Sequence, residues 1–130
     1  MNLLPARLRW IAVLPALLPA LLPSLPALAG EPLEVYVARL SAADHYNSSG
    51  ERLHSAAAII RQDRANLHRY GVRDPEDETD RFFAAADNRA RLERLLADGF
   101  LDRTTERIIV EDTPLVRVEV WPNHVEVRLK

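Results

Sequence analysis

The hydrophobic and polar positions of the chain change their period between residue 30 and the C-terminus. Residues 33–40, LEVYVARL, are rich in β-branched and aromatic side chains, which predicts a strand. From about residue 49 to residue 70 the apolar positions recur at helical spacing, and Gly71 follows where a residue that tolerates a left-handed backbone can end a helix. Ser48 and Glu51 have the spacing of a capping box, so we expect them to begin this first helix.

Two further helices are expected between residues 74 and 99. The segment RDPEDETDRFF offers Asp74 as an N-cap and Pro75 at the first helical position, followed by the acidic side chains that a helix N-terminus favours. An alternative interpretation of these acids is a calcium loop, but the sequence lacks the turn glycine and the bidentate glutamate of such a loop. Asp87 can cap a third helix, NRARLERLLAD, which ends at Gly99.

The C-terminal segment changes from helical spacing to a period of two. Charged residues alternate there with an apolar set, which predicts a β-hairpin with one dry and one wet face. Pairing Val120 with Val125 puts the apolar set on a single face and leaves a loop over 121–124, in which Pro122 favours a type I turn. We expect a further strand near 107–111. The apolar set comprises Val116, Val118, Val120, Val125, Val127 and Leu129.

Together these elements predict an α+β fold in a single small domain, residues 30–130. Its expected order is one N-terminal strand, three helices and then a three-stranded C-terminal antiparallel meander. The helices are expected to pack on one face of the sheet, because the hairpin has only one apolar face.

Residues 1–29 have the order of a secretory signal peptide. Arg7 and Arg9 form a basic head, an apolar run follows, and the small-residue sequence ALA at 27–29 ends it. Recurrent prolines interrupt the run, so it is poorly suited to a membrane-spanning helix of about 20 residues. We expect cleavage after Ala29, a periplasmic or secreted product, and no stable membrane anchor after processing.

Charge and cysteine content narrow the expected chemistry. The leader holds two of the 17 basic residues and none of the 19 acids, so the remaining chain has 15 basic and 19 acidic side chains and a net charge of −4. Nucleic acid is therefore not an expected partner, because phosphate contacts require a basic face. The sequence contains no cysteine, which excludes disulfides, thiol nucleophiles and thiolate metal sites.

Asp63 is the residue that most needs an explanation. On the first helix it lies at the edge of the apolar stripe, where a carboxylate must be paired, hydrogen-bonded or raised in pKa. The obvious partner is either Arg64 or an arginine from another element. One interpretation is a general base in a cleft; the favoured one is a structural ion pair.

Three other groups of polar side chains are candidates for binding. His54, Arg61 and His68 share the opposite stripe of the first helix, as either an anion-contacting ridge or a solvated face; no metal site is expected, because His54 and His68 lie about 21 Å apart. The loop DHYNSSG contains hydrolase residue types but fits turn and cap formation better. Trp121 and His124 at the hairpin tip form either a contact surface or part of the core.

The segment LSAADHYNSSGERLHSAAAIIRQDRANLHRYGVRDPEDETDRFF, with the later TPLVRVEVW, resembles a group of small exported bacterial proteins of unknown function. RQDRANLHR followed by RDPEDETD is the most specific part of the likeness. The resemblance implies export and a single domain, and it implies no activity.

We therefore expect a non-catalytic binding module of the bacterial envelope, without metal or cofactor, that binds an envelope protein or a small ligand. The alternative is a small hydrolase or lyase that uses Asp63, His45 or His68 as acid or base, with Arg64 orienting an anionic substrate. A subunit of a larger envelope assembly is a third possibility. The candidate binding residues are Asp44, His45, Asn47, Arg64, His68, Trp121 and His124.

Overall fold

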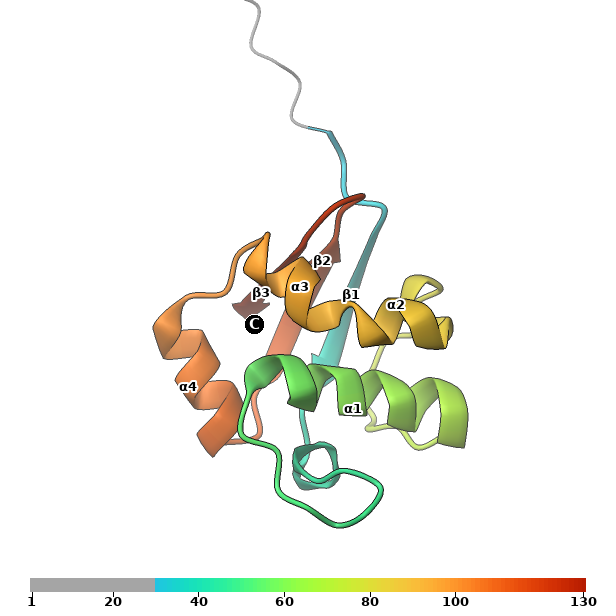
Figure 1. Ribbon diagram of the computed structural model, residues 1–130, viewed down its shortest axis with the longest axis vertical. Helices are drawn as coiled ribbons and strands as arrows, with labels where there is room; N and C mark the ends of the chain where they lie inside the picture. The colour runs from blue at the N-terminus through green and yellow to red at the C-terminus, as the bar shows by residue number, and fades with distance from the viewer. Residues whose placement is uncertain (1–29) are drawn as a thin grey trace, which may run out of the picture.

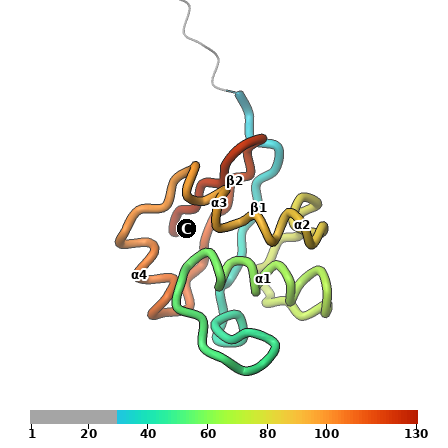
Figure 2. Tube along the Cα trace, in the orientation of Figure 1, coloured from blue at the N-terminus to red at the C-terminus, as the bar shows by residue number. Residues whose placement is uncertain are grey.

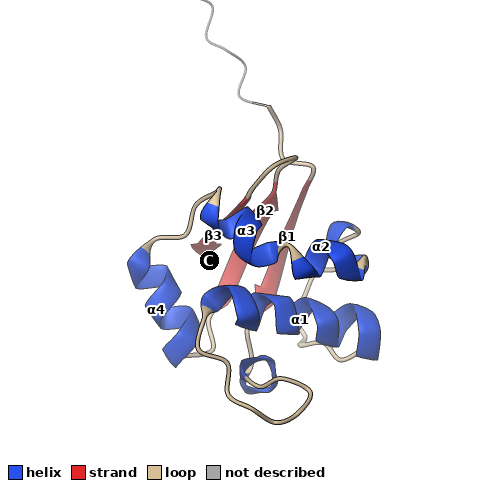
Figure 3. Ribbon diagram, in the orientation of Figure 1, coloured by secondary structure: helices blue, strands red, loops and turns tan. Residues whose placement is uncertain are grey.

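The structure is a computed structural model that describes residues 30–130, so the expected signal peptide lies outside the described residues. Four α-helices and a three-stranded antiparallel sheet make up this part of the chain (Figure 1). The α+β class is as expected. Figure 3 shows the helices gathered on one side of the strands. No helix of the described residues is long and apolar enough to span a membrane.

The sheet has the order β1 (Glu34–Arg39), β2 (Leu115–Val120), β3 (Val125–Leu129). The hairpin register is confirmed, because Val120 pairs with Val125 across β2 and β3. All five valines of the predicted apolar set are buried, and the charged residues between them face the other side. They pack with Tyr36, Leu40, Ile59, Ile60, Phe83, Leu92, Leu95 and Ile109 in the core.

The expected three-stranded C-terminal meander is wrong. Residues near 107–111 belong to the helix α4 (Arg103–Glu111), and the third strand of the sheet is the N-terminal β1. The apolar run at 108–110 is too short for its hydrophobic period to distinguish a strand from a helix. Asp102 decides it, because its side chain accepts hydrogen bonds from the backbone N–H groups of Thr104 and Thr105 and so begins a helix.

The first helix, α1 (Ala56–Tyr70), begins later than expected. Its N-cap is Ser55, whose side chain accepts from Ala58 N, and Gly71 ends it with φ of 67° as predicted. The Ser48 and Glu51 capping box is wrong. A loop forms there instead, in which Asn47 Oδ1 accepts from Ser49 N and Glu51 N. These side-chain to backbone hydrogen bonds compete with helix formation, so α1 begins only after this loop.

The helix expected to begin at Asp74 is absent, and residues 73–81 form an extended loop beside β1. Val37 N donates to Glu78 Oε2 at 2.9 Å, and Glu78 N donates to Val37 O at 2.8 Å. Arg39 N donates to Asp77 Oδ1 at 2.8 Å. We call residues 76–78 the edge clasp, because they satisfy the outer backbone groups of an edge strand that would otherwise be open to pairing.

The third expected helix is divided in two at Arg91. After the short 3-10 turn η2 (Phe82–Ala84), the chain forms α2 (Ala86–Ala90) and α3 (Leu92–Ala97). Asp87 does not cap this helix, since Ala85 holds the N-cap position and has no side-chain oxygen. A second 3-10 turn, η1 (Ala42–His45), follows β1. The chain trace in Figure 2 shows α1 running alongside α2 and α3.

Candidate functional site

Asp63 and Arg64 are consecutive in α1, yet both side chains are buried. The side chain of Asp63 is 2% exposed and that of Arg64 is 0% exposed. Arg64 Nε donates to Asp63 Oδ2 at 2.7 Å. Asp63 therefore forms an ion pair inside the fold, and of the two partners left open by the sequence it is Arg64, on the same helix, that makes it.

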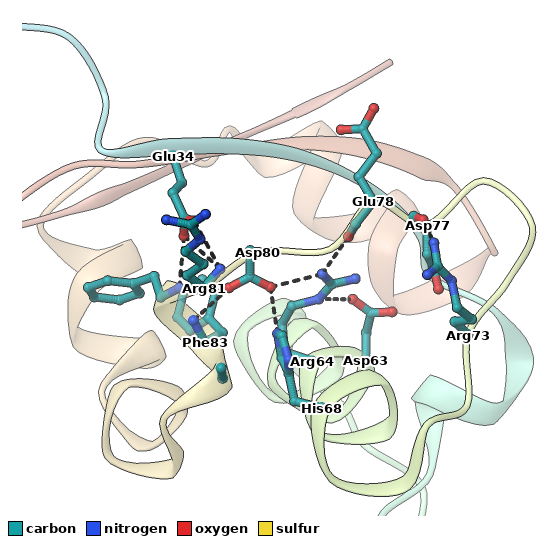
Figure 4. Close-up of polar contacts among 12 residues, drawn as sticks. Glu34, Asp63, Arg64, His68, Arg73, Asp77, Glu78, Asp80, Arg81 and Phe83 are labelled. Atoms are coloured by element: carbon teal, nitrogen blue, oxygen red, sulfur yellow. Dashed lines mark hydrogen bonds and ion pairs between the residues drawn. The ribbon is translucent and has the colours of Figure 1, made fainter.

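Arg64 also joins α1 to the chain that follows the edge clasp (Figure 4). Its Nη1 donates to the backbone oxygen of Glu78 at 3.0 Å and to Asp80 Oδ1 at 3.1 Å. The guanidinium carbon lies 4.3 Å from the centre of the Tyr36 ring on β1, a cation–π distance. One side chain thus connects α1, β1 and the loop between α1 and η2.

Asp80 completes the network, and both of its oxygens are occupied. Oδ1 receives Arg64 and also lies 2.7 Å from His68 Nε2, while Oδ2 accepts from Phe83 N at 2.6 Å. His68 comes from the last turns of α1, and its side chain is 12% exposed. We call Asp63, Arg64, His68 and Asp80 the buried network.

The charges of the buried network are not balanced evenly. Two carboxylates share one guanidinium, and His68 contacts only Asp80. Burial raises the pKa of Asp63 to about 7, although the Arg64 charge and hydrogen bond act to lower it. Burial acts to lower the pKa of Arg64, but Tyr36, Asp63 and Asp80 together hold that pKa above its ordinary value. The guanidinium therefore stays charged, whereas Asp63 can take up a proton near neutral pH.

No model of a protein family, no curated protein and no solved structure matches the chain. The resemblance to small exported bacterial proteins therefore stays a prediction.

His45 and Asp44, two of the predicted binding residues, are buried where η1 packs against α1 and α4. His45 Nδ1 lies 2.8 Å from Ser41 O, and Nε2 lies 2.8 Å from Ile109 O. Both ring nitrogens therefore lie against backbone carbonyls of the fold. Asp44 accepts from Ser41 N and from Asn66 Nδ2, and burial raises its pKa.

The remaining predicted binding residues also contact neighbours in the fold. Asn47 closes the loop before α1 and donates to Glu51 Oε2 at 2.9 Å. At the hairpin tip the rings of Trp121 and His124 stack, with centroids 5.4 Å apart and planes 6° from parallel. Trp121 Nε1 is buried without a hydrogen-bond partner among the described residues. Both rings are half-buried, so the tip is partly packed and partly exposed.

The structure brings Asp63, Arg64 and His68 together, but it places the other candidates elsewhere. His45 lies against α4, and Trp121 lies on the β2–β3 loop. No group of three or more His, Asp and Glu side chains in residues 30–130 is placed to hold a metal ion. The buried network has nearly no exposed surface, and its side chains join α1 to β1 and to the loop over residues 73–81.

Sequence reasoning missed Asp77, Glu78 and Asp80 as the residues that organise this region. All were interpreted as the acidic first turn of a helix. One feature of the sequence could have corrected this, because residues 73–81 contain no apolar side chain other than Pro75. The expected helix had only the adjacent Phe82 and Phe83 as apolar anchors, and two adjacent residues do not make the apolar stripe that an amphipathic helix requires.

Proposed function

We propose that the chain is an exported, non-catalytic binding module of the bacterial cell envelope, whose ligand is an envelope protein or a small molecule. One observation carries this proposal: the acid and base candidates have their functional atoms bonded inside the fold. Asp63 is paired with Arg64, His68 contacts Asp80, and His45 contacts two backbone carbonyls. A general acid or base needs a proton-transfer partner on the substrate, and these atoms face protein groups.

The alternative is a small acid/base hydrolase or lyase that acts on an anionic envelope substrate. One observation favours it, since the pKa of Asp63, raised to about 7 by burial, suits proton transfer at neutral pH. However, the Asp63 side chain is 2% exposed, so a substrate would reach it only if the loop 73–81 moved away from α1. The binding proposal needs no such movement.

A capture experiment separates the two proposals. Residues 30–130 contain the entire core described above and serve as bait for envelope extract; captured partners are then purified and titrated. A binding module should form a saturable complex with an intact partner, and Asp63→Asn should bind equally well under conditions where it is folded. A partner recovered cleaved or chemically altered by the wild type, but intact from Asp63→Asn, would support the hydrolase instead.

Export is the part of the proposal that can be tested directly. The order of the leader supports cleavage after Ala29, so N-terminal sequencing of the product from the periplasm or the medium should begin at Gly30. A folded product that stays in the cytoplasm and retains Met1 would contradict export, and it would leave the binding proposal to be judged by the capture experiment.

A further inference from the structure

A groove follows the outer side of α1, where α1 lies beside α2 and α3. It consists of three adjoining hollows that share lining residues: the first and second share Arg61 and Ala90, and the first and third share Ser55 and Glu93. The hollow at the C-terminal end of α1 has a volume of about 240 Å³, and the one at the other end about 270 Å³. We call the whole the α1 groove.

The C-terminal end of the α1 groove is positively charged. Arg61 and Arg69 from α1 and Arg89 from α2 line this hollow together with Gln62 and Tyr70, and no acidic residue lines it. Arg89 is held in place because its Nη1 donates to Phe83 O at 2.7 Å and to Ala84 O at 3.0 Å. The Arg69 guanidinium lies 5.2 Å from the centre of the exposed Tyr70 ring.

These three arginines lack acidic partners and also line the same hollow. Within residues 30–130, no ion pair joins Arg61, Arg69 or Arg89 to a carboxylate. Six other arginines do have one: Arg39, Arg64, Arg94, Arg107, Arg117 and Arg128. Arg52, Arg73, Arg81, Arg91 and Arg103 also have no ion pair among the described residues, but they do not line this hollow. In a domain with an excess of acids, three unpaired guanidiniums around one hollow form a local positive field that favours an anionic ligand.

The other end of the α1 groove has the opposite character. Its hollow is lined by Leu96 and Leu101 together with Glu93 and Glu106. Both glutamates would repel a ligand that is negatively charged along its whole length. The ligand that fits both ends carries anionic groups at the Tyr70 end and apolar groups at the Leu101 end.

The length of the α1 groove sets the size of this ligand. Its lining runs from Ser55 to Tyr70, a span of about 22 Å along a helix axis. An extended peptide covers that distance with about seven residues. Arg61 and Arg69 lie about 12 Å apart along α1, so two acidic side chains several residues apart on an extended peptide can each face one of them.

We propose that the α1 groove is a docking site for an extended peptide segment of a partner protein, with acidic residues against Arg61, Arg69 and Arg89 and apolar residues against Leu96 and Leu101. This inference rests on the proposed function and gives it a site and a ligand class. The charge complementarity and the two-part character of the groove carry it. A peptide supplies acidic and apolar side chains on one chain, which an inorganic polyanion cannot.

The test uses residues 30–130 and a capped peptide of sequence Glu-Gly-Glu-Ala-Leu-Ala-Leu, titrated while amide chemical shifts are recorded. We expect saturable shifts in α1 and α2, and no comparable binding of the same peptide with Lys in place of Glu. Arg61→Gln and Arg69→Gln should each weaken binding about tenfold, since a hydrogen bond to a charged group contributes at least that much. Arg81→Gln is the matched control, because Arg81 is exposed and lines none of the three hollows.

Three results would overturn the proposal: no saturable binding of the peptide, equal affinity in the Arg61→Gln and Arg69→Gln variants, or binding of inorganic triphosphate at the same residues with equal or higher affinity. The last would make the hollow a simple anion site. None of these contradicts the binding function itself, which the capture experiment tests with any partner. Mass spectrometry of the recovered peptide covers the other possibility, because cleavage by the folded domain would contradict the non-catalytic function.

Discussion

Asp63 and Arg64 are adjacent in the sequence and bonded to each other inside the fold, with Arg64 Nε 2.7 Å from Asp63 Oδ2. The same guanidinium also holds Asp80 at 3.1 Å, so Asp63 receives only a share of its charge. A buried carboxylate with an incomplete counter-charge costs free energy in its ionised form. The network therefore connects the stability of the domain to pH.

Asp63→Asn should remove a pH dependence of stability. Asp63 has a folded pKa of about 7 against an ordinary value of 3.8, so between these values the folded chain keeps a proton that the unfolded chain has lost. The free energy of unfolding should fall as pH rises from about 4 to about 7, by up to about 4 kcal/mol from this group. Urea unfolding at pH 4.5, 6 and 8 measures it.

Asp87→Asn is the control for that series, because it removes the same charge from an exposed position on α2. It should keep the slope of the wild type. Asp44, whose pKa is also raised by burial, contributes in the same direction and accounts for any slope left in Asp63→Asn. Parallel stability curves for the wild type and Asp63→Asn would mean that Arg64 compensates the Asp63 charge fully.

Replacement of Arg64 by lysine should destabilise the domain strongly, even though the charge is kept. The guanidinium bonds Asp63 through Nε and the Glu78 backbone and Asp80 through Nη1, a fork that an ammonium group cannot reproduce. We expect a loss of about 3 kcal/mol in the free energy of unfolding, the cost of leaving a buried charge poorly paired. Arg61→Lys, on the exposed side of the same helix, should change it by less than about 0.5 kcal/mol. Equal effects at the two positions would show that the fork is unimportant.

The sequence predicts correctly those parts of the fold in which a single hydrophobic period determines the secondary structure and the buried face. Alternation fixed the hairpin and its register, since a shift by one residue would bury Glu126. The position of Asp63 at the edge of an apolar stripe likewise indicated that its carboxylate needs a partner, and only the structure identifies that partner as Arg64. The limits of α1 were less predictable, because Ser48 and Ser55 are both good caps and only the closed Asn47 loop selects the second.

The parts that sequence missed depend on partners far along the chain. The acidic residues of the loop 73–81 are typical of a helix start, yet their carboxylates accept hydrogen bonds from groups on β1 and α1. Glu78 accepts from Val37 N, Asp77 from Arg39 N and Asp80 from Arg64 Nη1. These partners are 12 to 41 residues away along the chain, so no local sequence pattern indicates them. For the same reason the sequence could name Asp63, Arg64 and His68 as candidates but not Asp80, which joins them in one buried network.

The edge clasp predicts a contrast between two neighbouring acids. Asp77 is buried and accepts from the backbone N–H groups of Arg39 and Asp74, so Asp77→Ala leaves two donors unsatisfied and should cost about 2 kcal/mol. Glu76 makes an exposed ion pair with Arg39, and Glu76→Ala should have a clearly smaller effect. Urea unfolding compares the two, and light scattering should detect association of Asp77→Ala through the uncovered β1 edge. Equal stabilities would contradict the clasp.

Gly99 should tolerate no larger residue, because the chain between α3 and α4 passes directly over β3. A Cβ at this position would lie 1.9 Å from the backbone oxygen of Val125. Phe100 N also donates to that oxygen, and Val127 N donates to Phe100 O at 2.8 Å, so a methyl group must push the segment away and break this bridge. We expect Gly99→Ala to lower the free energy of unfolding by about 3 kcal/mol, because overpacking against rigid backbone is destabilising.

Two other glycines serve as controls for this prediction. Gly30→Ala should change the free energy of unfolding little, since no atom lies within 4 Å of its Cβ position. Gly71→Ala should cost about 1 kcal/mol, because it forces a left-handed backbone on alanine without a clash. Hydrogen exchange of the Val127 amide separates the mechanisms: it should become faster in Gly99→Ala at a temperature where Gly71→Ala still protects it. Unchanged protection of Val127 in Gly99→Ala would mean that the segment can accommodate the methyl group by moving along β3 rather than away from it.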